Sequence, residues 1–357
     1  MDQYLQKLIS FKSNSSDQAA CQEALKYVAD FCAAHGLHVK EYDFNGVASF
    51  VATVKPNDLE PKVMLVAHID VVPARQQDYT LTEKDGNYYG RGVYDMKSAI
   101  ANYMNVVDVL GDDLKNYSLG IMIVTDEEAG GQNGVKQLVA EGYRPGICIL
   151  PDGGQNWDIE ALAKGFIQAD INVVGKAAHG ARPWEGDSAI IKLVHVLNEV
   201  SHLFDENAIH TSSLNIGTIS GGDAINQIPA HASAALDIRY VKHEDYTHLT
   251  EAIHDICTRH GATYTKRFVG RPCVTDLKHP QVIPFVESIT KITGHEVTGT
   301  MSYGGSDGRF FAAVDVPCVL THPEGGEQHA TGEWISKKGF EQFNEVILDY
   351  LHKAAKN

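Results

Sequence analysis

Short apolar runs that alternate with helical segments constrain this chain more than any other feature of its sequence. In chain order the expected elements are strands at 50–54 and 63–72, a helix at about 96–110, a strand at 119–124, a helix near 135–141 and a strand at 147–150. This alternation predicts an α/β sheet covered by helices on both faces. Ahead of it we expect a helix over residues 16–36, with a serine to cap its start and a glycine after its last turn.

The segment from residue 164 to residue 271 has a different pattern. Its expected elements are a strand at 166–174, a helix at 189–204, strands at 214–219 and 232–240, a helix at 245–259 and a strand at 262–269. Beyond it the first pattern resumes and ends in a long helix over about 336–353. We therefore expect one domain formed by residues 1–163 and 272–357, with a compact α+β domain, residues 164–271, inserted into it.

The charge balance and the cysteines narrow the functional class. There are 46 acidic and 30 basic residues, so the net charge of −16 disfavours nucleic acid as a partner. No C-x-x-C pair is present, which argues against a disulfide framework and a thiolate metal site. The N-terminal residues do not have the pattern of a secretory signal, and no run approaches the roughly 18 apolar residues of a membrane span. We expect a soluble, cytoplasmic protein without a membrane partner.

The sequence AHIDVVP places a histidine and an aspartate at the end of an expected strand. Alternate side chains of a strand point the same way, so Asp70 can accept the second ring N–H of His68. Such a carboxylate is the usual neighbour of a zinc-binding histidine. Taken alone, the pattern fits a polar strand end equally well.

Three further sites carry acids. Asp95, in GRGVYDMK, stands between a glycine-rich turn and a helix, where it could also cap the helix. In IVTDEEAGG, three acids end a buried strand at Asp126, Glu127 and Glu128, the place where α/β sheets collect ligands; a solvated acidic loop is the alternative. Asp152, in CILPDGG, follows another apolar strand and could equally be a turn residue.

A second histidine completes the set far downstream. It lies in the glycine-rich loop EGGEQHATGEW and would be unremarkable alone. Together, however, two histidines and three acids at strand ends and glycine turns form a plausible nitrogen and oxygen ligand set for two metal ions. The candidate ligands are His68, Asp95, Glu128, Asp152 and His329.

The order and local context of these motifs resemble a family of di-zinc metallopeptidases. This family includes aminoacylase, carboxypeptidase G, peptidase T, peptidase V and succinyl-diaminopimelate desuccinylase. The resemblance covers essentially the whole chain, and the motifs AHIDVVP, GRGVYDMK and TDEEAGG are specific in combination. It implies a zinc-peptidase-like catalytic domain, an inserted lid and dimerisation domain, and two divalent metal ions, with zinc first and manganese or cobalt as alternatives.

The resemblance also implies how the metals are shared. His68 and Asp152 would bind one ion, Glu128 and His329 the other, and Asp95 would bridge both.

Catalytic roles are carried over in the same way. Glu127 would take the proton of a water that bridges the two metal ions, which lower its pKa. Asp70 would orient His68, and the peptide bond after Asp95 is often cis in this family. His179, in GKAAHGARPWEGDSAI, resembles a histidine that reaches the carbonyl of the scissile bond, usually from the partner subunit.

Substrate contacts follow from two further motifs and one loop. Asn226 in GGDAINQIP and Arg239 in LDIRY resemble the contacts to polar groups and to a carboxylate of the substrate. The GGSDG loop, including Gly305 and Ser306, resembles the loop that lines the substrate pocket. Because one inserted domain has no internal duplicate to supply His179, we expect a homodimer.

The residue type at position 152 bears on which amide is cut. In the family this acid tends to be aspartate in aminopeptidases and dipeptidases, and glutamate in deacylases and glutamate-releasing carboxypeptidases. Asp152 therefore favours a dipeptidase or small aminopeptidase. The chain length suits the desuccinylase and deacetylase branch better, so an N-acyl amino acid deacylase remains the alternative.

Two other classes of protein are weighed against this reading. The GGSDG loop fits the G-x-S-x-G pattern of a serine hydrolase, with Ser306 as nucleophile and His322 or His329 as base. That pattern needs a strand before the serine, GTMSY is a poor strand, and the acids at the strand ends would remain unexplained. A binding protein without catalysis would not need the full ligand set together with Glu127.

Overall fold

The computed structural model describes residues 1–205, 209–302 and 304–357, and the chain divides into two compact units. The larger unit contains residues 1–162, 274–302 and 306–357. The smaller unit contains the described residues between 163 and 273, with Gly304 and Gly305. The expected inserted domain, residues 164–271, lies inside the smaller unit; its role in lidding and dimerisation stays a prediction.

The larger unit is built on a six-stranded sheet in the order β1-β2-β6-β3-β7-β17. These strands are β1 (His38–Phe44), β2 (Val47–Thr53), β3 (Val63–His68), β6 (Leu119–Val124), β7 (Ile147–Ile149) and β17 (Cys318–Val319). β6, β3, β7 and β17 pair in parallel, whereas β1 and β2 form an antiparallel hairpin on β6. Every residue of β3 and β6 is buried, as their unbroken apolar sequences predict.

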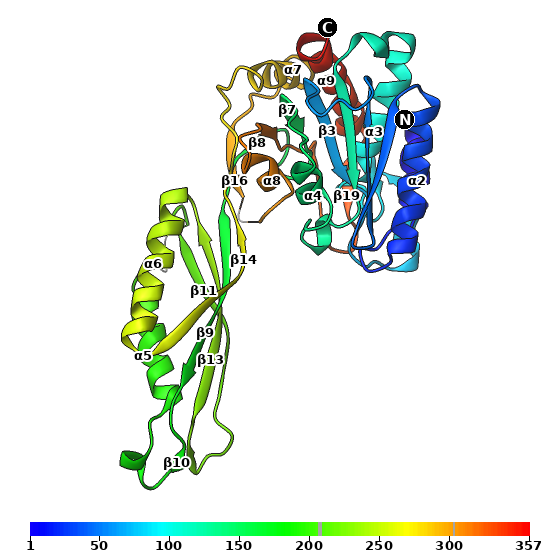
Figure 1. The fold of residues 1–357 in the computed structure, drawn as a ribbon. Helices are drawn as coiled ribbons and strands as arrows, with labels where there is room; N and C mark the ends of the chain where they lie inside the picture. The colour runs from blue at the N-terminus through cyan, green and yellow to red at the C-terminus, as the bar shows by residue number, and fades with distance from the viewer. Residues whose placement is uncertain (206–208, 303) are drawn as a thin grey trace. The chain divides into compact units, whose positions relative to one another are not determined.

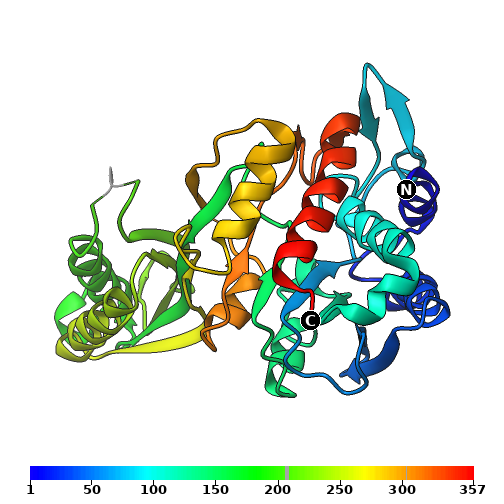
Figure 2. The ribbon, with the colours of Figure 1, turned by 90° about the horizontal axis from the view of Figure 1, so that it is seen from above.

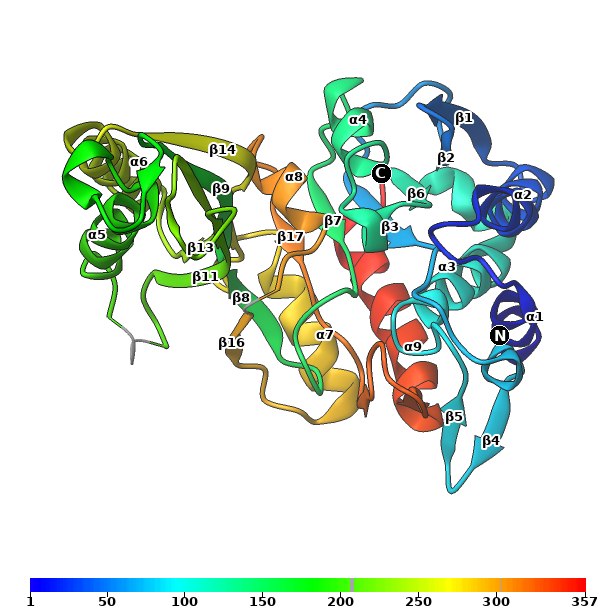
Figure 3. The same ribbon diagram turned by 90° about the horizontal axis from the view of Figure 1, so that it is seen from below.

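Helices cover both faces of this sheet. They are α1 (Asp2–Ser10), α2 (Gln18–Ala34), α3 (Lys97–Leu110), α4 (Val135–Ala140), α7 (Ile283–Thr293), α8 (Gly308–Ala312) and α9 (Lys337–Ala354). Figure 3 shows α2, α3 and α9 on one side of the sheet and α4 on the other, and Figure 2 shows α9 packed against α7. The predicted α/β class is confirmed.

Three local expectations in this unit were wrong. The cap of α2 is Asp17, which accepts the main-chain N–H of Ala20 (3.1 Å), and not the preceding serine. β3 ends at His68, so Asp70 lies beyond the strand. The segment GTMSY does contain a strand, β16 (Gly299–Ser302). The first two differences arise because neighbouring residues compete for the same cap or strand end, and local pattern does not decide between them.

Two smaller sheets are formed by strands that precede or follow the elements of the six-stranded sheet in the sequence. One has the order β15-β8-β16, with β15 (Cys273–Val274) and β8 (Ile159–Ala163). The other has the order β18-β19-β5-β4 and contains β4 (Thr82–Lys84), β5 (Asn87–Tyr89), β18 (Gly325–Gly326) and β19 (Trp334–Ser336). The second sheet joins the residues before α3 to those before α9, because β19 pairs with β5.

The smaller unit is an antiparallel sheet with two helices on one face. Its strands, in the order β11-β13-β9-β14, are β9 (Gly165–Val174), β11 (Ser213–Gly221), β13 (His231–Tyr240) and β14 (Ala262–Gly270). The helices α5 (Ala189–Ser201) and α6 (His243–Arg259) bury their apolar faces against it. Figure 1 shows β10 (Ala178–His179) beyond one end of this sheet. It pairs with β12 (Gln227–Ile228).

Among the described residues, each helix is either too short or too polar to cross a lipid bilayer.

Candidate metal centre

Two groups of side chains suited to metal ions lie in the larger unit. Within each group, one nitrogen or oxygen atom per residue lies within 4.8 Å of the corresponding atoms of the others. The first group is His68, Glu127 and Asp152, and the second is Asp95, Glu128 and His329. The structure thus brings together all the predicted metal ligands, and it places the predicted base, Glu127, beside His68 and Asp152.

The parallel sheet explains why the first group converges. His68 is the last residue of β3, Glu127 begins a short 3-10 helix (Glu127–Ala129) just after β6, and Asp152 follows β7. Because β6, β3 and β7 are adjacent and parallel, their carboxyl ends meet at one edge of the sheet. Residues from three distant parts of the sequence therefore face one another.

Asp95 belongs to the second group and also contacts the first. Its Oδ1 is 2.9 Å from His68 Nε2, and its Oδ2 is 3.0 Å from His329 Nε2. His329 Nε2 is also 3.1 Å from Glu128 Oε2, and Gln328 donates to Asp95 Oδ2 (2.7 Å). The peptide bond between Asp95 and Met96 is cis. Asp95 thus contacts a histidine of each group, one through each carboxylate oxygen.

The tautomer of His68 follows from its neighbours. Nδ1 lies 2.9 Å from the main-chain carbonyl oxygen of Asp70 and 3.5 Å from Oδ1 of the same residue. A carbonyl can only accept, so Nδ1 carries the proton and Nε2 is the nitrogen open to a metal ion. The nearest acceptor is therefore the carbonyl of Asp70, whereas the sequence pattern pointed to its carboxylate.

The Asp70 carboxylate instead connects to the loop after β6. It accepts the main-chain N–H groups of Glu127 (3.3 Å) and Glu128 (3.2 Å) and the hydroxyl of Ser15 (2.8 Å). Asp70, two residues beyond the end of β3, therefore connects this segment to the two acids that follow β6.

Burial and close contacts shift the pKa values of this centre. Burial raises the pKa of Glu127 and that of Asp152 well above their ordinary range. Burial alone would also raise the pKa of Asp95, but hydrogen bonds from His329 and His68 hold it well below its usual value. The same contact with Asp95, helped by Glu128, raises the pKa of His329 to about 10. The ionisable groups of this centre therefore shift one another's pKa values strongly.

The side chains present fit a pair of divalent cations. Oδ2 of Asp152 is buried and has no hydrogen-bond partner among the described residues. An orphaned carboxylate oxygen in the interior is costly unless a cation or a proton satisfies it. Imidazole nitrogens combined with carboxylates are ligands that zinc, manganese and cobalt accept.

Four of the residues predicted to contact the substrate lie in the smaller unit, namely His179, Asn226, Arg239 and, in the pocket loop, Gly305. His179, in β10, and Asn226 are exposed neighbours, since the N–H of Gly180 donates to the Asn226 carbonyl (2.7 Å). Arg239, near the end of β13, forms two hydrogen bonds with Asp237 (2.6 and 3.1 Å). A substrate carboxylate would have to share this guanidinium with Asp237.

The predicted pocket loop gives no support to a serine nucleophile. Ser306 is buried, and its Oγ accepts the N–H of Gly308 (3.3 Å). The buried ring of His322 contacts the carbonyl of Gly153 through Nδ1 (2.9 Å), and His329 contacts Asp95 and Glu128. Among the described residues, neither ring forms a hydrogen bond with Ser306 Oγ.

Sequence reasoning missed several residues that surround the centre. Glu333 accepts hydrogen bonds from the segment that leads to Asp95. The ring of His322 stacks on Tyr94, with centroids 4.3 Å apart. Asp307 is 1% exposed, and burial raises its pKa to about 7. The signal for Asp307 was present, since it lies inside the GGSDG loop, whereas Glu333 leaves no local pattern. His322 was considered only as a possible base for Ser306.

Comparisons with known proteins found related sequences. The family model described as Peptidase family M20/M25/M40 matches residues 64–353. A succinyl-diaminopimelate desuccinylase of Hahella chejuensis is 28% identical, over 97% of this chain and 95% of its own length.

Solved structures share the fold. A tripeptidase of Staphylococcus aureus superposes with a TM-score of 0.80 at 22% identity, over 99% of this chain and 97% of that one. The aminopeptidase PepT of Bacillus cereus superposes with a TM-score of 0.81 at 20% identity, over the same shares.

Proposed function

The chain belongs to peptidase family M20/M25/M40, and from this premise we propose that it cleaves an amide bond of a small peptide, as a dipeptidase or aminopeptidase. It is a metal-dependent hydrolase of this family. One observation carries the proposal: Asp95 contacts His68 through one carboxylate oxygen and His329 through the other, with Glu127 and Asp152 beside it. Such an arrangement suits two cations that share one carboxylate.

The metal-binding roles in this proposal follow the two groups. His68 and Asp152 would hold one ion, Glu128 and His329 the other, and Asp95 both. We propose zinc, with manganese and cobalt as alternatives, because imidazole and carboxylate ligands suit all three. When bound, the two ions supply Lewis acidity that lowers the pKa of water and polarises the amide carbonyl.

Glu127 is proposed as the general base. Three of the four acids in the two groups are assigned to the metal ions, which leaves Glu127 beside His68 and Asp152 and free to move a proton. Its main-chain N–H donates to Asp70, which fixes the backbone at this position (3.3 Å). Glu127 would take a proton from the attacking water and return it to the leaving nitrogen.

The geometry of the smaller unit supports the proposed homodimer. In the register of β13 with β9, Arg239 pairs with Phe166 and His231 with Val174. Arg239 and the end of the sheet at His231 are therefore roughly 26 Å apart, from eight residues at about 3.3 Å each. His179 lies beyond that end, so one unit cannot place His179 and Arg239 on the same small substrate. If both contact it, two subunits contribute.

An edge strand offers a surface for the second copy. β11 is at the edge of its sheet, and Ile219 on it is 64% exposed. Helix α5 packs beside β11 and exposes Ile191 and Val194. An edge strand with neighbouring exposed apolar side chains is suited to pairing with the same strand of another chain.

A second candidate function is the removal of an acyl group from an amino acid. It is favoured by the desuccinylase of Hahella chejuensis, which matches nearly the whole chain. Asp152 favours the peptidase, since aspartate at this position resembles the aminopeptidase and dipeptidase branch. We also propose a cytoplasmic location, because the six cysteines are buried and none of them lies in a C-x-x-C pair, which suits a compartment where thiols stay reduced.

The test is a panel of dipeptides, tripeptides and N-acyl amino acids, assayed with added zinc, manganese or cobalt. We expect the fastest turnover on peptides; a preference for N-succinyl or N-acetyl amino acids would establish the deacylase instead. Glu127→Gln should stay folded and bind metal, while its turnover falls by at least about 100-fold. The exposed Glu141→Gln is the matched control. An active Glu127→Gln enzyme would refute the assigned base.

A further inference from the structure

One buried carboxylate, that of Glu333, accepts hydrogen bonds from the segment 91–95, which ends at Asp95. The side chain of Glu333 is 2% exposed. Its Oε1 accepts the main-chain N–H groups of Tyr94 (2.9 Å) and Asp95 (3.0 Å). Its Oε2 accepts the N–H of Gly92 (2.9 Å) and Nη1 of Arg91 (2.6 Å). Four donors from five consecutive residues thus converge on one side chain.

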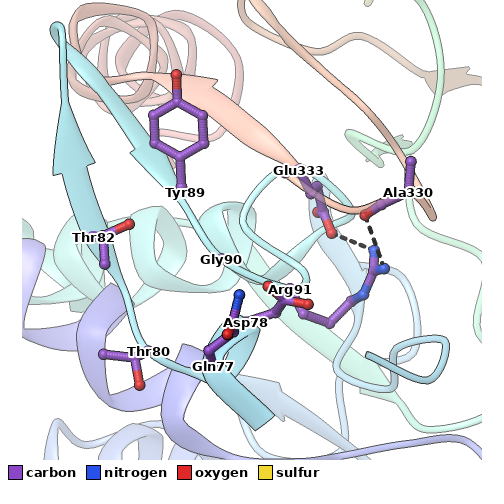
Figure 4. A pocket seen from close by; sticks show the side chains of 10 residues that line it. Gln77, Asp78, Thr80, Thr82, Tyr89, Gly90, Arg91, Ala330 and Glu333 are labelled. Carbon is purple, nitrogen blue, oxygen red and sulfur yellow. Dashed lines mark hydrogen bonds and ion pairs between the residues drawn. The ribbon is translucent and has the colours of Figure 1, made fainter. Parts of the chain in front are cut away.

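The partner of this carboxylate, Arg91, reaches the loop of the second histidine. Its Nη1 binds Glu333, and its Nη2 donates to the main-chain carbonyl of Ala330 (3.1 Å), the residue directly after His329. Figure 4 shows both contacts, at the wall of a cleft of about 200 Å³. Arg91 and Glu333 therefore connect the segment that carries Asp95 with the loop that carries His329.

The backbone around Gly92 leaves little freedom for another arrangement. Gly92 has φ +81°, and a Cβ there would lie 2.8 Å from a side-chain atom of Val71. A residue other than glycine would be strained and would clash. The segment thus adopts a conformation that needs external support, and Glu333 accepts the N–H groups on both sides of Val93.

From these contacts we propose that Glu333 is a positioning residue for the metal centre, with Arg91 as its partner. Glu333 holds the main chain of Asp95 so that the two carboxylate oxygens reach His68 and His329 together. This role goes beyond the proposed reaction, since it concerns how the chain builds the centre and not which amide it cuts. Residues that support metal ligands in this way typically change metal affinity by about 10- to 100-fold when they are replaced.

The variant Glu333→Gln tests this role. The glutamine amide keeps one acceptor oxygen, but an NH2 group takes the place of the other. Two of the four donors would then face a donor instead of an acceptor, and their hydrogen bonds would be lost. We expect the dissociation constant for zinc or cobalt(II), measured by calorimetric titration of the metal-free protein, to rise by about 10- to 100-fold. The absorption spectrum of the cobalt(II) protein should change as well.

Two controls separate positioning from a general loss of stability. Glu324→Gln removes the same charge from an exposed residue nearby and should leave metal affinity unchanged. Thermal unfolding of the metal-free proteins measures stability without metal. If Glu333→Gln lowers this stability but binds both metal ions as tightly as the unaltered protein, the positioning role is refuted.

If Glu333→Gln does not fold, a second variant tests the same positioning role. Arg91→Lys retains the positive charge but cannot bind Glu333 and the Ala330 carbonyl with one planar fork. We expect a smaller but measurable rise in the dissociation constant, by several-fold. Unchanged affinity in Arg91→Lys would overturn the link to the His329 loop. Neither result depends on turnover, so the proposal can fail independently of the proposed function.

Discussion

The pH dependence of stability offers a quantitative test that does not involve the metal-binding residues. Glu160, on β8, is 4% exposed, and burial raises the pKa of its carboxyl from 4.5 to about 7. Hydrogen bonds from Ser302 and from the main chain of Gly154 oppose this rise but do not cancel it. Glu160→Gln keeps the shape of the side chain and removes its ionisation.

The sign follows from proton binding. Between about pH 4.5 and pH 7 the folded protein keeps the Glu160 proton, whereas the unfolded chain has released it. The folded state binds more protons there, so its stability falls as the pH rises through this window. At about 1.4 kcal/mol for each pKa unit, the loss by pH 8 amounts to about 3 kcal/mol. The Glu160→Gln variant has no ionisable group at this position, so it does not lose this stability as the pH rises.

The assay is urea unfolding of metal-free protein, followed by circular dichroism at pH 5, 6, 7 and 8. We expect the free energy of unfolding of Glu160→Gln, relative to that of the unaltered protein, to rise by about 2 to 3 kcal/mol from pH 5 to pH 8. Glu345→Gln, the same change at an exposed position of α9, is the control. A difference that stays constant with pH would refute the reasoning.

Three further outcomes are expected. Removal of metal by a chelator should abolish turnover, and metal at 100 times its dissociation constant should raise the free energy of unfolding by about 2.7 kcal/mol; full turnover after chelation would contradict the metal mechanism. Ile219→Lys on β11 should give an inactive but folded monomer by light scattering, and a fully active monomer would exclude His179 acting from the partner subunit. Lys291 and Lys353 contact Asp349 (2.6 and 2.8 Å), and although burial opposes the shift they hold its pKa below the ordinary value. Asp349→Asn should therefore cost roughly 2 kcal/mol at pH 7, and this deficit should shrink as the pH falls below about 4; a deficit equal at pH 3 and pH 7 would count against it.

Several elements were predictable because their signals are local. The strand Leu119–Val124 has the expected bounds, since an unbroken apolar run of this length can only be buried. The acids after β6 and β7 were placed correctly at one sheet edge, because parallel strands bring their carboxyl ends together. The helix α1 was missed, as its nine residues give only a short apolar pattern, Leu5, Leu8 and Ile9.

The metal-centre candidates were readable from sequence, but their supporting residues were not. His68, Asp95 and Glu128 lie in short motifs that combine glycine turns with strand ends, and each motif is visible by itself. Glu333 acts on residues about 240 positions earlier in the chain, so no local spacing relates them. The contact of His68 with the Asp70 carbonyl likewise depends on where β3 ends.

The sequence alone therefore determined the class of fold and the side chains that can bind metal, because hydrophobic periodicity and residue chemistry are local properties. Only the tertiary structure decided which buried acid holds the backbone of Asp95, and that His179 and Arg239 stand at opposite ends of one sheet. Those facts depend on strand register and on contacts between distant segments, which are set when the chain packs.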